Sequence, residues 1–163
     1  MTENKTINRN FSLHAKSYSK NAFVQKEVAT KLCDFVKSEI KSSDEILDLG
    51  CGTGFIAENL DNLERLTQLD SSKEMCEIAS KKAKTIQADL NNLNLRDQSY
   101  DIVLSSFTLH WVENLNNLLS DIKNLLTKNG LLAFSIPVKG TLYELKEAFN
   151  YVGLDKINNF PRF

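Results

Sequence analysis

Three glycines follow an aspartate in the segment Asp48-Leu49-Gly50-Cys51-Gly52-Thr53-Gly54. Glycines let a backbone turn approach a ligand closely, and the acidic residue before them can bind a cationic group. A dinucleotide fingerprint, G-x-G-x-x-G, would need its third glycine at Phe55, and the phosphate-loop pattern G-x-x-x-x-G-K-[ST] is absent. Because a carboxylate here would repel a pyrophosphate, the D-x-G-x-G-x-G pattern indicates a ligand with an ammonium group. A tight glycine turn without a ligand is the alternative.

Two more aspartates stand at the ends of predicted strands. Asp70 closes the alternating segment 65–70, where an acidic residue can accept hydrogen bonds from both ribose hydroxyls. Dinucleotide enzymes share this feature, so Asp70 does not choose the cofactor, and taken alone it is more simply a solvated turn residue. Asp89, followed by Leu90, closes the predicted strand 85–89. It is a candidate for ligand binding, and the alternative is that it caps a helix or lies in a loop.

Side chains that could border a second substrate follow the predicted strand 100–106. Ser105 lies in that strand, and His110 and Trp111 come after it. His110 is the titratable base of this segment, although a single histidine beside a tryptophan is more often structural. His14, the other histidine, is expected to be solvated. No spacing is typical of a metal site or of a catalytic triad, so we expect no metal and no catalytic dyad.

Hydrophobic periodicity predicts the elements that position these residues. Short apolar or alternating segments predict five strands, at 45–49, 65–70, 85–89, 100–106 and 131–136. Amphipathic spacing predicts helices at 22–40, 55–60, 71–79, 115–126 and from 141 onward, whereas residues 1–18 show no clear period and are expected to be irregular. Strands alternating with helices predict an α/β fold with a doubly wound, mostly parallel sheet, whose ligands bind at the carboxyl ends of the strands.

Local signals mark where some helices begin and end. Residues 71–74 and 141–144 match the capping box S/T-x-x-E, which predicts a helix start at each place. Asn129-Gly130 is expected to end the helix at 115–126 as a C-cap pair.

Composition excludes several classes of protein. The 163 residues carry 20 Lys and Arg against 21 Asp and Glu, and 42% are hydrophobic, which fits one folded domain. This balance disfavours a disordered polyelectrolyte and a nucleic-acid binder, and no apolar run is long enough for a membrane helix. The three cysteines show no C-x-x-C spacing, and no secretory signal is visible, so we expect reduced thiols in the cytoplasm.

The segment 45–54 closely resembles the cofactor motif of class I S-adenosylmethionine (SAM) methyltransferases, and the ends of the chain narrow this resemblance. Residues 10–18, with the pattern F-x-x-x-A-x-x-Y, and Gln25 are similar to the N-terminal segment of malonyl-acyl-carrier-protein O-methyltransferases of biotin synthesis. Residues 140–145 and 157–160 resemble that family's G-x-x-L-x-E-L helix and V-N-R-F segment, with Asn159 at the usual arginine. Quinone-pathway and other small-molecule methyltransferases share the central motifs.

The resemblance implies a Rossmann-like methyltransferase sheet, SAM as cofactor, and a malonyl thioester on acyl-carrier protein as methyl acceptor. An ionised carboxylate acceptor requires no catalytic base, and His110 and Trp111 would border it. Lys16, Lys20 and Lys26 are a candidate surface for the acidic carrier, or simply a solvated helix face. The implied cofactor-binding residues are Tyr18, Asp48, Gly50, Gly52, Gly54, Asp70, Ser71, Asp89, Leu90 and Ser105.

One departure from the family concerns length. Class I methyltransferases have seven strands, and this sequence predicts five, so we expect a C-terminally truncated domain that lacks the last two. Its parts would be an N-terminal arm and helix (1–41), a cofactor-binding core (45–137) and an incomplete acceptor-side region (141–163). The alternatives to the malonyl activity are another small-molecule methyltransferase, an inactive SAM-binding fragment and, more remotely, an NAD oxidoreductase.

Overall fold

The computed structural model describes residues 3–95, 99–141, 143, 144, 147 and 151. Its helices are α1 (Glu3–Asn21), α2 (Phe23–Val36), α3 (Lys73–Ala79) and α4 (Leu115–Leu125). Its strands are β1 (Ile46–Leu49), β2 (Leu66–Asp70), β3 (Lys84–Gln87), β4 (Tyr100–Ser106) and β5 (Leu126–Ser135). The helix predicted from 141 onward falls largely outside the described residues, and the segment 157–160 lies wholly outside them.

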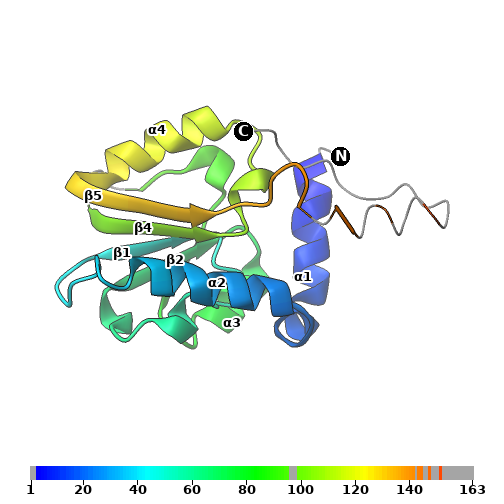
Figure 1. Cartoon of the computed structure of the whole chain (residues 1–163), viewed down its shortest axis with the longest axis horizontal. Coiled ribbons are helices and arrows are strands. Elements are labelled where there is room, and N and C mark those ends of the chain that lie inside the picture. Colours follow the sequence, from blue (N-terminus) through cyan, green and yellow to red (C-terminus); the bar gives the residue numbers. More distant parts are fainter. Residues whose placement is uncertain (1–2, 96–98, 142, 145–146, 148–150, 152–163) are drawn as a thin grey trace.

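The five described strands form one parallel sheet in the order β3-β2-β1-β4-β5 (Figure 1). The chain first builds outward from β1 through β2 to β3 and then returns to the other side of β1 with β4. The strand order therefore reverses between β1 and β4, and a crevice opens at the carboxyl ends of these two strands. This arrangement confirms the predicted α/β class and the doubly wound, parallel sheet.

Side chains from both faces of β1 enter the hydrophobic core. Ile46 packs in the cluster that includes residues of α2, while Leu47 and Leu49 pack with α4 on the opposite face. The helices accordingly cover both faces of the sheet, as Figure 1 shows for α2 and α4. A strand buried on both faces carries a nearly continuous apolar run, which is why segment 45–49 reads as a buried strand. No helix in the described part of the chain is long and apolar enough to cross a membrane.

The expectation that residues 1–18 are irregular was wrong. The structure has α1 at this position, and Phe11, Ala15 and Tyr18 lie on one side of it. The spacing of four and then three residues between them is helical. Ala15 is buried, and Phe11 and Tyr18 make an edge-to-face contact. Tertiary packing of this short stripe stabilises a helix whose other residues are mostly polar.

Three smaller predictions also needed correction. The helix expected at 55–60 is reduced to a single 3-10 turn, Ala57–Asn59, and Leu60 directly after it is extended. The helix expected at 115–126 ends at Leu125, and β5 begins at the next residue, so Asn129-Gly130 lies inside a strand instead of capping a helix. A register shift in the pairing of β5 with β4, between Tyr100 and Ile102, accommodates the extra strand residues. At α3 the N-cap is Ser72, not Ser71.

Candidate functional site

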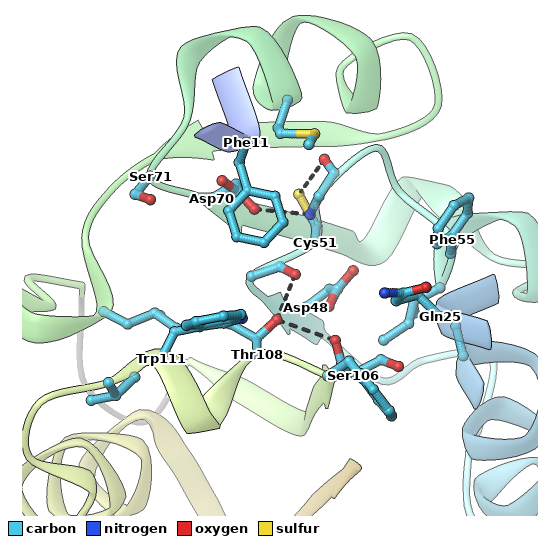
Figure 2. Close-up of a pocket in the computed structure, with 18 of the residues that line it drawn as sticks. Phe11, Gln25, Asp48, Cys51, Phe55, Asp70, Ser71, Ser106, Thr108 and Trp111 are labelled. Carbon is cyan, nitrogen blue, oxygen red and sulfur yellow. Dashed lines mark hydrogen bonds between the residues drawn. The ribbon is translucent and has the colours of Figure 1, made fainter. Parts of the chain in front are cut away.

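A cavity of about 420 Å³ lies at the carboxyl ends of β1, β2 and β4 (Figure 2). Its position agrees with the reversal of strand order between β1 and β4. Nine of the twelve residues that the sequence singled out line it: Tyr18, Asp48, Gly50, Gly52, Asp70, Ser71, Asp89, Leu90 and Trp111. Segments that are distant in sequence are therefore brought to one place, which is what a binding site built on strand ends requires.

The glycine turn after β1 is closely packed against the segment after β4. Gly50 has a φ of +72°, and a Cβ atom there would lie 2.1 Å from Cγ2 of Thr108. The hydroxyl of Thr108 is also within hydrogen-bond distance (3.0 Å) of the Gly50 carbonyl oxygen, which it can use as an acceptor. Only glycine satisfies both the backbone conformation and the close contact at this position.

Asp48 is the most unusual ionisable group of the cavity. It is 1% exposed, and neither carboxylate oxygen has a hydrogen-bond partner among the described residues. Burial, followed by the negative charge of Asp70, raises the pKa of Asp48 to about 8. Buried polar groups are normally paired, so an unpaired carboxylate that lines a cavity fits a ligand that brings a positive charge.

Asp70 lies beside Asp48 but is well satisfied. One of its carboxylate oxygens accepts from the backbone N–H of Gly52 at 2.9 Å, and the other accepts from that of Ser72, also at 2.9 Å. Burial raises the pKa of Asp70, although these backbone donors oppose the rise. The carboxylate is thus fixed at the end of β2, where it could accept hydrogen bonds from the hydroxyls of a ribose.

Asp89 both caps a short turn and lines the cavity. Its side chain caps the 3-10 turn Leu90–Asn92 by accepting from the Asn91 backbone N–H at 2.9 Å, and the residue also lines the cavity. Asn91 in turn accepts from the backbone N–H of Glu113 at 2.9 Å. This wall of the cavity is therefore held by short polar contacts between the segments after β3 and β4.

Aromatic side chains from α1 cover the opening above the strand ends. Tyr18 stacks on Phe55 with ring centroids 6.0 Å apart, and Phe11 meets the edges of Tyr18 and Trp111 at 5.9 and 6.0 Å. Burial and the charge of Asp70 raise the pKa of Tyr18. The Tyr18 ring also lies against the glycine turn, because a Cβ atom built at Gly52 would be 3.9 Å from its Cε1 atom.

Three of the predicted residues do not line the cavity. Gly54 belongs to the far side of the turn. Ser105 is fully buried and donates its hydroxyl to the Leu49 carbonyl at 2.8 Å, while its neighbour Ser106 lines the cavity. His110 packs against Trp111 with ring centroids 4.5 Å apart, and burial lowers its pKa to about 4. A histidine in this state is neutral at pH 7 and behaves as a packing residue.

Several residues of the cavity wall were not among the predicted cofactor-binding residues, although Phe11 and Gln25 belong to the N-terminal pattern noted in the sequence. Gln25 lines the cavity from α2, and in Figure 2 its amide points toward the same region as the Asp48 carboxylate. Phe107 has a φ of +54°, rare for a residue with a side chain, and its N–H donates to the Ser135 carbonyl at 3.0 Å. The helical stripe of Phe11 could have been found in the sequence, whereas the backbone conformation of Phe107 leaves no local signal.

The ionisable carboxyl groups of the cavity wall have no basic counterparts among the described lining residues. All four charged residues among the described lining residues are acidic: Asp48, Asp70, Asp89 and Glu113. Within the same part of the chain no three His, Cys, Asp or Glu side chains gather closely enough to hold a metal ion. The arrangement therefore suits an organic ligand of positive charge with hydroxyl groups.

Comparison with known proteins agrees with this geometry. The family described as "Methyltransferase domain" matches residues 47–134, more than half of the chain. A malonyl-[acyl-carrier protein] O-methyltransferase of Ilyobacter polytropus is 32% identical over 95% of this chain and 62% of its own length. A protein of the same name from Acetivibrio thermocellus is 32% identical over 83% of this chain and 50% of its own. The chain thus spans between half and two thirds of the length of these relatives.

Solved structures share the fold. A SAM-dependent methyltransferase of Mesorhizobium loti is 27% identical, with a TM-score of 0.56 over 64% of this chain and 52% of that one. A SAM-dependent methyltransferase of Thermotoga maritima, described as a possible histamine N-methyltransferase, has a TM-score of 0.70 at 24% identity over 93% of this chain and 72% of that one. The second likeness shows the fold alone.

Proposed function

This chain belongs to the methyltransferase domain family, whose cosubstrate is SAM, and from that premise we propose that it methylates the free carboxylate of a malonyl thioester on acyl-carrier protein. The names of the relatives support this substrate. A further relative, 32% identical over 88% of this chain and 26% of its own length, is named as a bifunctional protein of biotin biosynthesis. We therefore place the reaction in that pathway.

The observation that carries the proposal is the unpaired Asp48 carboxylate in an acidic cavity. SAM brings an ammonium and a sulfonium group, and burying a positive charge is favourable only beside an opposite charge. Asp48 would hold the ammonium end, and Asp70 would accept from the ribose hydroxyls. Asp89 and the backbone N–H of Leu90 would hold the adenine, while Tyr18 would cover the methionine end. Gly54 and Ser105 would act through the turn and strand that they build.

The chain's own residues have little covalent chemistry to perform in such a reaction. SAM supplies a methyl group activated by its sulfonium. A malonyl carboxylate is already ionised at pH 7, so no residue has to remove a proton, and a neutral, packed His110 is compatible with this role. The cavity wall must align the acceptor and exclude water, and alignment alone is worth roughly 7–11 kcal/mol in well-oriented systems. Trp111 and Phe11 are placed to exclude water from the acceptor side.

The carrier protein would approach near the N-terminal helices. Lys16 and Lys20 are exposed on α1, and Lys26 is exposed on α2, where it also pairs with Glu58 at 3.0 Å. Exposed lysines steer an acidic partner toward the opening. We also propose a cytoplasmic location, supported by the three free cysteines, Cys33, Cys51 and Cys76.

A second candidate, methylation of another small molecule, is favoured by one observation. The described residues that line the cavity include no lysine or arginine to pair with an acceptor carboxylate. An acceptor without a negative charge would meet this acidic wall more readily.

Two measurements test these proposals. Calorimetric titration with SAM, S-adenosylhomocysteine and NAD should show binding of the first two only, and absence of SAM binding at millimolar concentration would overturn the cofactor assignment. Methyl transfer is then measured with malonyl- and acetyl-acyl-carrier protein. Transfer to the malonyl form alone supports the proposed substrate, because the acetyl form lacks the free carboxylate. Binding of SAM without transfer to the malonyl form would contradict it.

A further inference from the structure

Lys82 makes an unusual set of contacts on the far side of the glycine turn. It lies between α3 and β3, outside the cavity wall. Its ammonium donates to the carbonyl oxygens of Thr53 at 2.9 Å and Gly54 at 3.2 Å, and to a carboxylate oxygen of Glu58 at 2.6 Å. A lysine ammonium has three hydrogens, so each of them has an acceptor here.

These contacts complete a two-sided attachment of the turn. On the cavity side, the Gly52 N–H is held by Asp70. On the far side, Thr53 and Gly54 are buried, and their carbonyl oxygens are the atoms that Lys82 reaches. A carbonyl buried without a partner is costly, so the ammonium stabilises the far side in this conformation.

The same attachment reaches the two helices that border the cavity. The second carboxylate oxygen of Glu58 pairs with Lys26 of α2 at 3.0 Å. Ser19 of α1 donates its hydroxyl to that of Thr53 at 2.9 Å. Burial raises the pKa of Glu58, but the hydrogen bonds from Lys82 and Lys26 leave it lowered overall, so the carboxylate stays ionised between the two lysines.

We infer that Lys82 is a positioning residue for cosubstrate binding: its ammonium holds the far side of residues 50–54 so that the cavity side keeps its shape. This inference rests on the proposed SAM site. Removing the ammonium leaves two buried carbonyl oxygens unpaired, and the turn must move to hydrate them. The turn borders the part of the ligand that SAM and S-adenosylhomocysteine share, so affinity for both should fall equally.

The test compares four variants by calorimetric titration with SAM and with S-adenosylhomocysteine. Lys82→Met keeps the length of the side chain and removes its charge, and it should weaken binding of both ligands about tenfold. Lys82→Arg retains donors for the carbonyls and should lose no more than about threefold. Lys81→Met, at the exposed neighbouring lysine, should bind as the unsubstituted protein does. Ile122→Val lowers stability in the core on the opposite face of the sheet and should leave affinity unchanged.

Two results would overturn the inference. One is Lys82→Met affinity within about twofold of the unsubstituted protein. The other is that Ile122→Val, with a melting temperature lowered as much as in Lys82→Met, loses as much affinity as Lys82→Met does. The loss would then come from general destabilisation. Failure of the unsubstituted protein to bind SAM is a separate result, which overturns the proposed function and this inference with it.

Discussion

The neighbouring residues Asp48 and Asp70 differ in the hydrogen bonds that their carboxylates accept. The Asp70 carboxylate is held by the backbone N–H groups of Gly52 and Ser72, so its negative charge is already compensated. The Asp48 carboxylate has no hydrogen-bond partner among the described residues, and the nearby negative charge of Asp70 adds to the effect of burial in raising its pKa. The difference suits the two residues to different roles in the proposed site, where Asp70 would orient hydroxyl groups and Asp48 would bind a cation.

Binding of SAM should therefore release a proton from Asp48. The raised pKa of about 8 means that the free protein holds a proton there at pH 6.5, whereas a bound ammonium favours the ionised form. We expect about one proton released per SAM and roughly tenfold tighter binding per pH unit between about pH 5.5 and 7. Calorimetry in buffers of different ionisation enthalpy measures the release. Asp48→Asn should bind more weakly and without buffer dependence, and buffer-independent binding by the unsubstituted protein would refute the linkage.

Helix α1 contributes two aromatic side chains to the wall of the cavity. Ser12 is hydrogen-bonded to Ser72 at 3.0 Å, at the start of α3, and Ser19 donates to Thr53 in the glycine turn. Phe11 and Tyr18, each next to one of these attachments, contact each other and line the cavity. The C-terminal half of α1 is thus attached to two segments that border the cavity.

Phe11→Ala should weaken these aromatic contacts without unfolding the domain. The substitution removes two edge-to-face contacts, with Tyr18 and Trp111, each worth about 0.5–1.5 kcal/mol. We expect SAM to dissociate roughly tenfold faster and amide exchange in α1 to increase. Leu13→Ala is the matched control, because Leu13 is on the same helix but is 68% exposed. Equal dissociation rates in the two variants would show that α1 does not retain the ligand.

The elements also show what the sequence could and could not predict. Strand β1 and the acidic residues at the strand ends follow from apolar runs and their spacing, because burial and side-chain period decide them. The start of β5 at Leu126 does not, since its pairing with Tyr100 depends on a neighbouring strand distant in sequence. The cavity contacts of Thr108 are equally non-local: they exist because β4 lies beside β1 and brings Thr108 onto Gly50.

Viewed as a whole, the molecule is a sheet buried on both faces with its site at one end. Core residues such as Leu47 and Ile46 stabilise the two faces, and the cavity lies beyond the last residues of the strands. The fold therefore carries an unfavourable group, Asp48, at the edge of an otherwise apolar core. The cost of that group should be measurable in the stability of the entire domain.

The stability of the free protein should fall as pH rises, because of Asp48. Its ordinary pKa in the unfolded chain is about 3.9, and in the folded protein burial raises it to about 8. The folded state thus binds a proton that the unfolded state has lost, so this contribution is complete below about pH 3.9 and is lost as pH rises toward 8. Asp48→Asn removes the contribution.

Urea denaturation of both proteins at about pH 5, 6.5 and 8 measures the effect. The free energy of unfolding of Asp48→Asn should rise steadily relative to that of the unsubstituted protein across this range, by roughly 3–4 kcal/mol in total, since the substituted side chain has no charge to bury at high pH. Asp61→Asn, at an exposed position, is the control. Its free energy of unfolding should differ from that of the unsubstituted protein by the same amount at each pH. If the two curves for Asp48→Asn and the unsubstituted protein run parallel with pH, then the Asp48 carboxylate is ionised in the free protein, and the site is already arranged for a cation before one binds.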